Sequence, residues 1–170
     1  LLAKPAFLLG NTANFLSYAT LFGVFFLVPF ALVRIYQDTA LAAGLRLSIL
    51  PVMLGLVAPL GGMLYDRLGP RLPTCFGMLV CLTGLAILYL FLDGNPANLW
   101  LVTLSLAVIG VGQGLFISPN SSAIMSTAPA DETGQAGSVL NVMRMLGMST
   151  GIAGASTLLA LSLGDDSGST

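Results

Sequence analysis

Long apolar runs without a single charge dominate this chain. No Asp, Glu, Lys or Arg occurs from Pro5 to Val33, from Leu47 to Tyr65 or from Leu72 to Leu92. A helix that crosses the hydrocarbon core of a bilayer needs about 20 apolar residues, and each of these runs approaches or exceeds that length. Because the backbone in lipid must satisfy its own hydrogen bonds, such runs predict transmembrane helices.

Two further spans are expected in the second half of the chain. The charge-free stretch from Gly94 to Ala130 begins with Asn and Pro residues and becomes polar from Ser118 onward. It therefore supplies one span, which we expect to continue as a helix past Pro119. The last span contains a single charge, Arg144. The expected ranges are 6–33, 40–65, 72–92, 98–126 and 134–163, and an odd number of spans places the chain ends on opposite faces of the membrane.

Composition excludes several other classes of protein. Charged residues make up 8% of the chain and the mean hydropathy is +0.94, whereas soluble domains carry about 25% charged residues. The chain has no run of basic residues of the kind that indicates a nucleic-acid partner. The chain has no histidine, and we interpret Cys75 and Cys81 as small packing residues, so we expect no metal and no cofactor. The spans hold no base and nucleophile arrangement, so we expect no enzyme.

The positive charges predict the orientation of the chain in the membrane. Cytoplasmic loops of membrane proteins carry an excess of Lys and Arg. If the chain begins in the cytoplasm, four of its six Lys and Arg residues lie on or near that side. We therefore expect a multi-pass protein of the inner or plasma membrane with a cytoplasmic N-terminus. The inner residues are Lys4, Arg67, Arg71 and Arg144, and the outer residues are Arg34 and Arg46.

Local signals indicate where helices begin, bend and approach one another. Asp38 and Thr39 are expected to cap the second helix. Prolines in or near the spans indicate either fixed bends or hinges of a moving protein. Pairs of small residues four apart let helix backbones approach closely, so we interpret them as packing sites. The prolines are Pro29, Pro51, Pro59 and Pro119, and the pairs are Gly110/Gly114 and Gly147/Gly151, the second extended by Gly154 and Ala155.

A short charged turn joins two of the spans at residues 62–71, with the sequence GMLYDRLGPR. This pattern resembles the signature loop of the major facilitator superfamily of transporters. The resemblance implies a gating role, in which the loop forms a charge-relay latch between two transporter halves. The alternative is a solvated turn whose charges only fix topology. The loop residues concerned are Gly62, Asp66, Arg67, Gly69 and Arg71, and Pro70 stands where the family usually carries a basic residue.

Four more stretches, 41–51, 58–62, 110–119 and 134–151, look like the drug–proton antiporter branch with fourteen spans. Their order is that of the C-terminal half of such a transporter, which has six core helices. The resemblance implies an all-α integral membrane fold, a five-transmembrane-helix bundle over residues 1–170. The final helix and the whole N-terminal half are then expected to lie outside this chain.

Polar residues inside the spans share helix faces and are candidates for the lining of a substrate cavity. Polar groups that face lipid cost several kcal/mol each, so these faces should point at other helices or at water. The alternative for each residue is a hydrogen bond between helices. For Arg144 the alternative is a side chain that reaches back to the headgroups. The candidates are Asn11, Asn14, Tyr18, Phe25, Gln113, Asn120, Asn141, Arg144 and Met148.

These observations favour part of a secondary active transporter, with proton-coupled multidrug efflux by alternating access as the first hypothesis. Its partners would be the lipid bilayer, the missing N-terminal half, protons and a lipophilic small molecule. The alternatives are a nutrient or siderophore carrier of the same fold and a free-standing membrane scaffold or assembly subunit. All acids lie in loops or at helix ends, so the proton-carrying acid is expected in the missing half. They are Asp38, Asp66, Asp93, Asp131, Glu132, Asp165 and Asp166.

Overall fold

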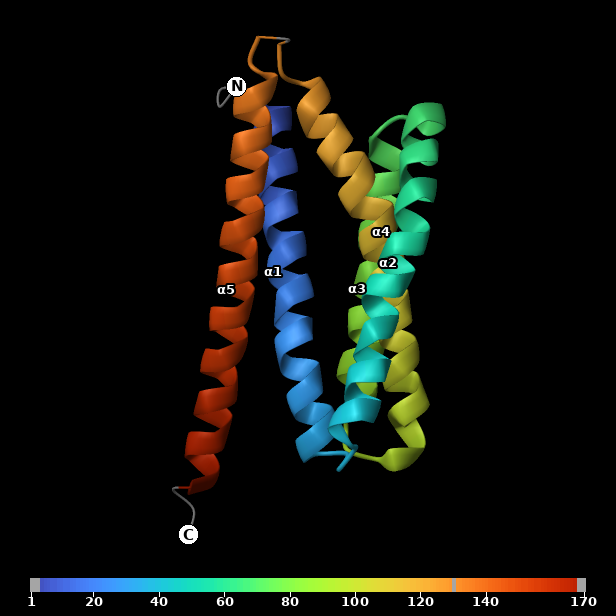
Figure 1. The fold of residues 1–170 in the computed structure, drawn as a ribbon, viewed down its shortest axis with the longest axis vertical. Coiled ribbons are helices and arrows are strands. Elements are labelled where there is room, and N and C mark those ends of the chain that lie inside the picture. Colours follow the sequence, from blue (N-terminus) through green and yellow to red (C-terminus); the bar gives the residue numbers. More distant parts are fainter. Residues whose placement is uncertain (1–3, 130, 168–170) are drawn as a thin grey trace.

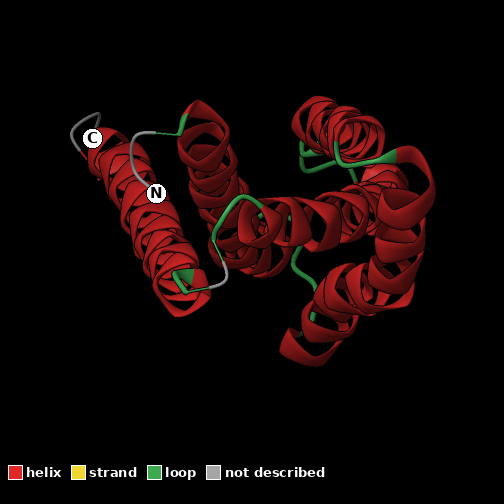
Figure 2. Cartoon of the chain, turned by 90° about the horizontal axis from the view of Figure 1, so that it is seen from above, coloured by secondary structure: helices red, strands yellow, loops and turns green. Residues whose placement is uncertain are grey.

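Five long helices account for most of the part of the chain that the structure describes. The computed structural model describes residues 4–129 and 131–167, and for residues 162–167 the backbone alone is considered. Within these ranges there is no strand, and short loops connect the helices (Figure 1, Figure 2). The expected all-α bundle is therefore confirmed. Its elements are α1 (Pro5–Arg34), α2 (Ala40–Leu68), α3 (Arg71–Phe91), the 3-10 turn η1 (Pro96–Asn98), α4 (Leu99–Ser126) and α5 (Thr133–Ser167).

Four of the helices are long and apolar enough to cross a membrane: α1, α2, α3 and the continuous segment Pro96–Ser126 that contains α4. Helix α5 has 35 residues, well above the roughly 20 that a span requires. Its role as the fifth span remains a prediction, because the search of the described residues found only the other four.

Local residues define both ends of α2, and the cap at its start is the expected one. The Thr39 hydroxyl accepts a hydrogen bond from the backbone N–H of Ala42 at 3.2 Å and so caps the helix. At the other end, Gly69 has φ = 76°, a left-handed conformation that glycine adopts without cost. Its N–H donates to the Tyr65 carbonyl, and the chain then turns sharply into α3. The charged loop is therefore a tight reversal between two spans.

Helix α4 is the centre of one group of helices, because it packs against both α2 and α3 (Figure 1). A side chain at Gly114 would lie 2.8 Å from the Leu54 carbonyl oxygen of α2, and Gly110 meets the Leu50 carbonyl in the same way. On the other side of α4, Gly112 lies against the backbone of Cys81 in α3. Glycines at alternate positions thus let α4 approach two neighbours at backbone distance.

Helices α1 and α5 form the second group and lie side by side (Figure 1). Gly147 lies against the Phe15 carbonyl and Gly151 against the Ala19 carbonyl, so this glycine pair also packs helices together. Gly154 was expected to extend this contact. It does not, because no atom lies within 4 Å of where its side chain would be. Ala155, four residues after Gly151, is buried and continues the row.

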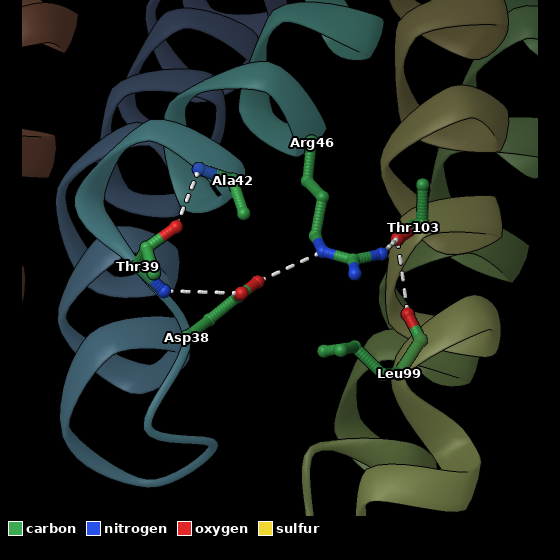
Figure 3. A network of polar contacts seen from close by, with 6 residues as sticks. All are labelled: Asp38, Thr39, Ala42, Arg46, Leu99 and Thr103. Atoms are coloured by element: carbon green, nitrogen blue, oxygen red, sulfur yellow. Dashed lines mark hydrogen bonds and ion pairs between the residues drawn. The ribbon is translucent and has the colours of Figure 1, made fainter.

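At the end where α1 turns into α2, a polar network ties three segments together (Figure 3). The Arg46 Nε donates to the Asp38 carboxylate at 2.9 Å, and its Nη1 donates to the Thr103 hydroxyl of α4 at 3.1 Å. Asp38 also accepts the backbone N–H of Thr39. The Arg46 and Asp38 side chains are 31% and 15% exposed, so the pair is only partly screened by solvent. This network fixes the start of α2 against α4.

We expect Asp38→Asn to lower the stability of the folded protein by about 1 kcal/mol, because Arg46 would keep a partly buried charge without its counter-ion. The measurement is the midpoint of thermal unfolding in detergent, which should fall by a few degrees. Arg34→Gln is the matched control, since Arg34 is exposed at the end of α1. Equal midpoints for the two variants would contradict the stabilising role of the pair.

Candidate functional site

Helix α1 presents a buried polar face at the level where it meets α5. Asn11 and Asn14 are both almost completely buried. The Asn11 Nδ2 donates to the Phe7 carbonyl at 2.9 Å, and the Asn14 Nδ2 donates across to the Leu140 carbonyl of α5 at 3.4 Å. The Oδ1 atoms of both amides have no hydrogen-bond partner. Each asparagine is therefore oriented by its nitrogen and leaves an unused acceptor.

Arg144 of α5 reaches the same face of α1. Its guanidinium carbon lies 5.0 Å from the centre of the Tyr18 ring, within the range of a cation–π contact. The buried Nε of Arg144 has no hydrogen-bond partner. Tyr18 itself is buried between the two helices. The structure thus brings four of the expected cavity residues together: Asn11, Asn14, Tyr18 and Arg144.

Gln113 and Asn120 of α4 are also buried, but they face α1 and are bound to it. The Gln113 Oε1 accepts the Ser17 hydroxyl, and its Nε2 donates to the Ser17 carbonyl at 3.3 Å. The Asn120 Nδ2 donates to the Gly10 carbonyl at 3.1 Å. These hydrogen bonds join the two helix groups, so Gln113 and Asn120 bridge helices, and each also lines one of two cavities between α1 and α3.

The remaining expected residues are Phe25, Met148 and Asn141, and the first two pack against the apolar core that contains Tyr18. Phe25 is half-buried, with its ring 6.0 Å from that of Phe22. Met148 is half-buried against the main apolar core. Asn141, three residues before Arg144 on α5, is exposed. Whether any of the three faces a substrate stays a prediction.

The charged loop lies at the opposite end of the molecule from the Arg46 network. Asp66, Arg67 and Arg71 are all exposed, and Gly69 provides the reversal. Gly62 lies one turn before Asp66, with the Ser118 hydroxyl of α4 at 3.5 Å from where a side chain would begin. Within residues 4–129 and 131–167, no ion pair to Asp66 is formed.

An apolar groove, which the sequence did not predict, runs between α1 and α3 with α4 at its base. It contains two cavities of about 560 and 640 Å³. Ser17 and Thr20 of α1 line the first, together with Cys75 and Leu82 of α3 and Gln113 of α4. Cys75 is exposed in this groove, so its interpretation as a packing residue is wrong, whereas Cys81 is buried as expected.

Two polar residues that form hydrogen bonds to another helix were not predicted from the sequence. Ser17 was overlooked although it is a polar residue inside a span, and its hydroxyl binds Gln113. Thr103 was overlooked in the same way, and it binds Arg46. The usable signal was the rule that a polar side chain within a span requires a partner. That rule shows the need for a partner but not which residue supplies it.

A family model described as Major Facilitator Superfamily matches residues 1–152. The riboflavin transporter RibZ of Clostridioides difficile is 32% identical over 160 residues, which are 92% of this chain and 34% of that protein. The multidrug resistance protein Stp of Mycobacterium tuberculosis is 30% identical over 157 residues (88% of this chain, 29% of that protein).

The tetracenomycin C resistance and export protein of Streptomyces glaucescens is 30% identical over 153 residues, which are 88% of this chain and 27% of that protein. The chain thus spans about a third or less of the length of these curated relatives. No solved structure matches the chain.

Proposed function

The chain belongs to the major facilitator superfamily, and from this premise we propose that it forms most of the C-terminal half of a proton-coupled exporter of lipophilic compounds. The superfamily consists of multi-pass membrane transporters rather than enzymes. Similarity to a multidrug resistance protein and to an antibiotic export protein supports efflux as the direction of transport. The missing N-terminal half would supply the opposite wall of the cavity, and the N-terminus of this chain would lie in the cytoplasm.

The observation that carries the proposal is the unsatisfied polar face shared by α1 and α5. Two buried amide oxygens and a buried guanidinium nitrogen have no partner there. In a membrane such groups are costly unless they meet water, a ligand or another helix. A cavity that opens alternately to each side, between two halves of a transporter, supplies all of these.

A second candidate is a nutrient carrier of the same fold, which takes up a polar compound. Similarity to a protein named as a riboflavin transporter favours it. Because fold does not determine substrate, the two candidates are separated by what is transported and in which direction. A free-standing scaffold receives no support from the curated relatives, all of which carry transporter or resistance names in the examples above.

The first test compares the complete transporter with residues 1–170 alone in cells loaded with cationic, neutral and anionic fluorescent dyes. The complete transporter is expected to lower dye accumulation. Residues 1–170 are expected to insert in the membrane without exporting dye, because the polar face of α1 and α5 would lack its opposing wall. Riboflavin uptake by the complete transporter, without dye export, would favour the nutrient carrier. Dye export by residues 1–170 alone would contradict the proposal.

A second test concerns proton coupling. We expect single neutralisation of each acid of this chain to leave substrate-induced proton release unchanged, because none of the described acids lies in the middle of a helix. Hydrogen bonds from the Asn95 backbone N–H and the Asn98 amide lower the pKa of Asp93, so this carboxylate stays ionised at neutral pH. Proton release is measured with a pH indicator on adding substrate to weakly buffered protein. Loss of release in any one variant would place the proton carrier in this chain.

A further inference from the structure

Arg144 carries a charge that no acid of the described residues neutralises. The ion pair formed within residues 4–129 and 131–167 joins Arg46 to Asp38, far along the bundle. Arg144 lies roughly 16 Å along α5 from its start at Thr133. Its guanidinium lies over the Tyr18 ring, near the middle of α1, and so extends sideways rather than toward a membrane surface. This position argues against a side chain that reaches back to the headgroups.

The Arg144 Nε lacks a hydrogen-bond acceptor, and two asparagine oxygens on the facing helix α1 lack a donor. Asn14 is 0% exposed, precedes Tyr18 by one turn, and donates to the carbonyl of Leu140, one turn before Arg144. Its Oδ1 is unpartnered, as is that of Asn11 one turn earlier. The cluster therefore offers a cationic donor and two neutral acceptors on adjoining helices. An anion without a hydrogen-bond donor would satisfy Arg144 but would leave the two asparagine oxygens without partners.

We propose that Arg144 and Asn14 bind a lipophilic carboxylic acid that also carries an N–H or O–H donor, with the Tyr18 ring holding the guanidinium in place. This inference rests on the proposed transport function and names the class of compound transported. The guanidinium binds a carboxylate through two parallel N–H···O bonds. The donor of the compound binds the Asn14 Oδ1, and half-buried Met148, one turn beyond Arg144, contacts the apolar body.

The alternative counter-ion is a carboxylate on a helix of the facing half. Such a carboxylate would satisfy Arg144 but would leave the asparagine oxygens without donors. A compound with both groups satisfies Arg144 and Asn14 together. A small set of fluorescent probes distinguishes the two sources. Dansylglycine carries an apolar ring, a sulfonamide N–H and a carboxylate; its carboxamide lacks the charge, and dansylsarcosine lacks the N–H.

Binding of the three probes is measured by fluorescence titration of the complete transporter in lipid nanodiscs, with the signal of empty nanodiscs subtracted. We expect dansylglycine to bind at least tenfold more tightly than its carboxamide, and several-fold more tightly than dansylsarcosine. Arg144→Gln should abolish the preference for the acid, whereas Arg34→Gln, at an exposed helix end, should keep it. Asn14→Leu should abolish the preference for dansylglycine over dansylsarcosine. Unchanged binding of the carboxamide shows that the Arg144→Gln variant is folded, and unchanged binding of dansylsarcosine, which has no N–H for Asn14, shows the same for Asn14→Leu.

Equal affinity of the wild-type protein for the acid and the carboxamide would overturn the inference. A preference for the acid that survives Arg144→Gln would overturn it too, as would a preference that emerges only after an acid of the facing half is neutralised. In each case export of neutral or cationic dyes would leave the proposed transport function standing. Failure to export any dye would instead contradict that function itself.

Discussion

Replacing Gly151 by leucine is expected to separate α5 from α1 and to destabilise the protein by at least about 2 kcal/mol. A side chain at this position would run into the Ala19 carbonyl of α1, which is backbone and cannot rotate away. Helix α5 makes few contacts with α4, so the crossing with α1 carries most of its packing. The substitution should therefore lower the unfolding midpoint and the monodisperse fraction of the complete transporter in mild detergent.

Gly154→Leu provides a matched control on the same helix. No atom lies within 4 Å of a side chain built at Gly154. Leucine has a higher helix propensity than glycine by roughly 1 kcal/mol, so at Gly154 the change should be neutral or slightly stabilising. The same propensity gain applies at Gly151, which means that a loss there must come from the crossing. Equal midpoints for the two variants would show that the α1–α5 contact is looser than described.

The helices could be predicted from the sequence because charge and apolar length act locally. The charge-free runs correspond to long helices of the structure. The fourth span was expected to continue past Pro119, and this is confirmed, since α4 ends at Ser126. The hydroxyl of Thr39 caps α2 because its own neighbour three residues on supplies the N–H. Such features depend only on residues close in the chain, so no knowledge of the tertiary fold was required.

Helix packing could be predicted in part, because spacing fixes which residues share a helix face. Gly147 and Gly151 are four apart and meet carbonyls of α1 that are also four apart. Ala155 continues that row and is buried, whereas Gly154 is only three residues beyond Gly151 and is rotated off the contact. The sequence indicated the contact face but not the helix that covers it.

The polar partners could not be predicted, because they depend on the register between distant helices. Ser17 and Gln113 are 96 residues apart in the chain, and Arg46 and Thr103 are 57 apart. A shift of one turn in either helix pair would give each side chain a different partner. For the same reason the sequence could not distinguish Gln113 from Asn14, which were both candidates for the cavity lining. The Gln113 side-chain oxygen accepts a hydrogen bond from Ser17, whereas the Asn14 side-chain oxygen has no partner.

Asp66→Asn in the complete transporter is expected to leave membrane insertion unchanged but to shift the protein toward the inward-open state and slow export. Asp66 lies in the last turn of α2, where the negative end of the helix dipole disfavours a carboxylate. The helix of the facing half would offer its positive end, and such contacts contribute roughly 0.3–2 kcal/mol. That range corresponds to roughly a two- to thirty-fold change in the ratio of two states.

The shift is measured by the labelling rate of a cysteine at Asn141, an exposed position of α5 at the level of Arg144, after Cys75 and Cys81 are replaced by alanine. Labelling from the cytoplasmic side should be faster in Asp66→Asn, because a latch that closes this side in the outward-open state, as we propose for the loop, would lose its charge. Asp131→Asn is the matched control, since Asp131 is exposed at the same end of the bundle. Unchanged labelling together with unchanged export would reduce the loop to a signal for membrane topology.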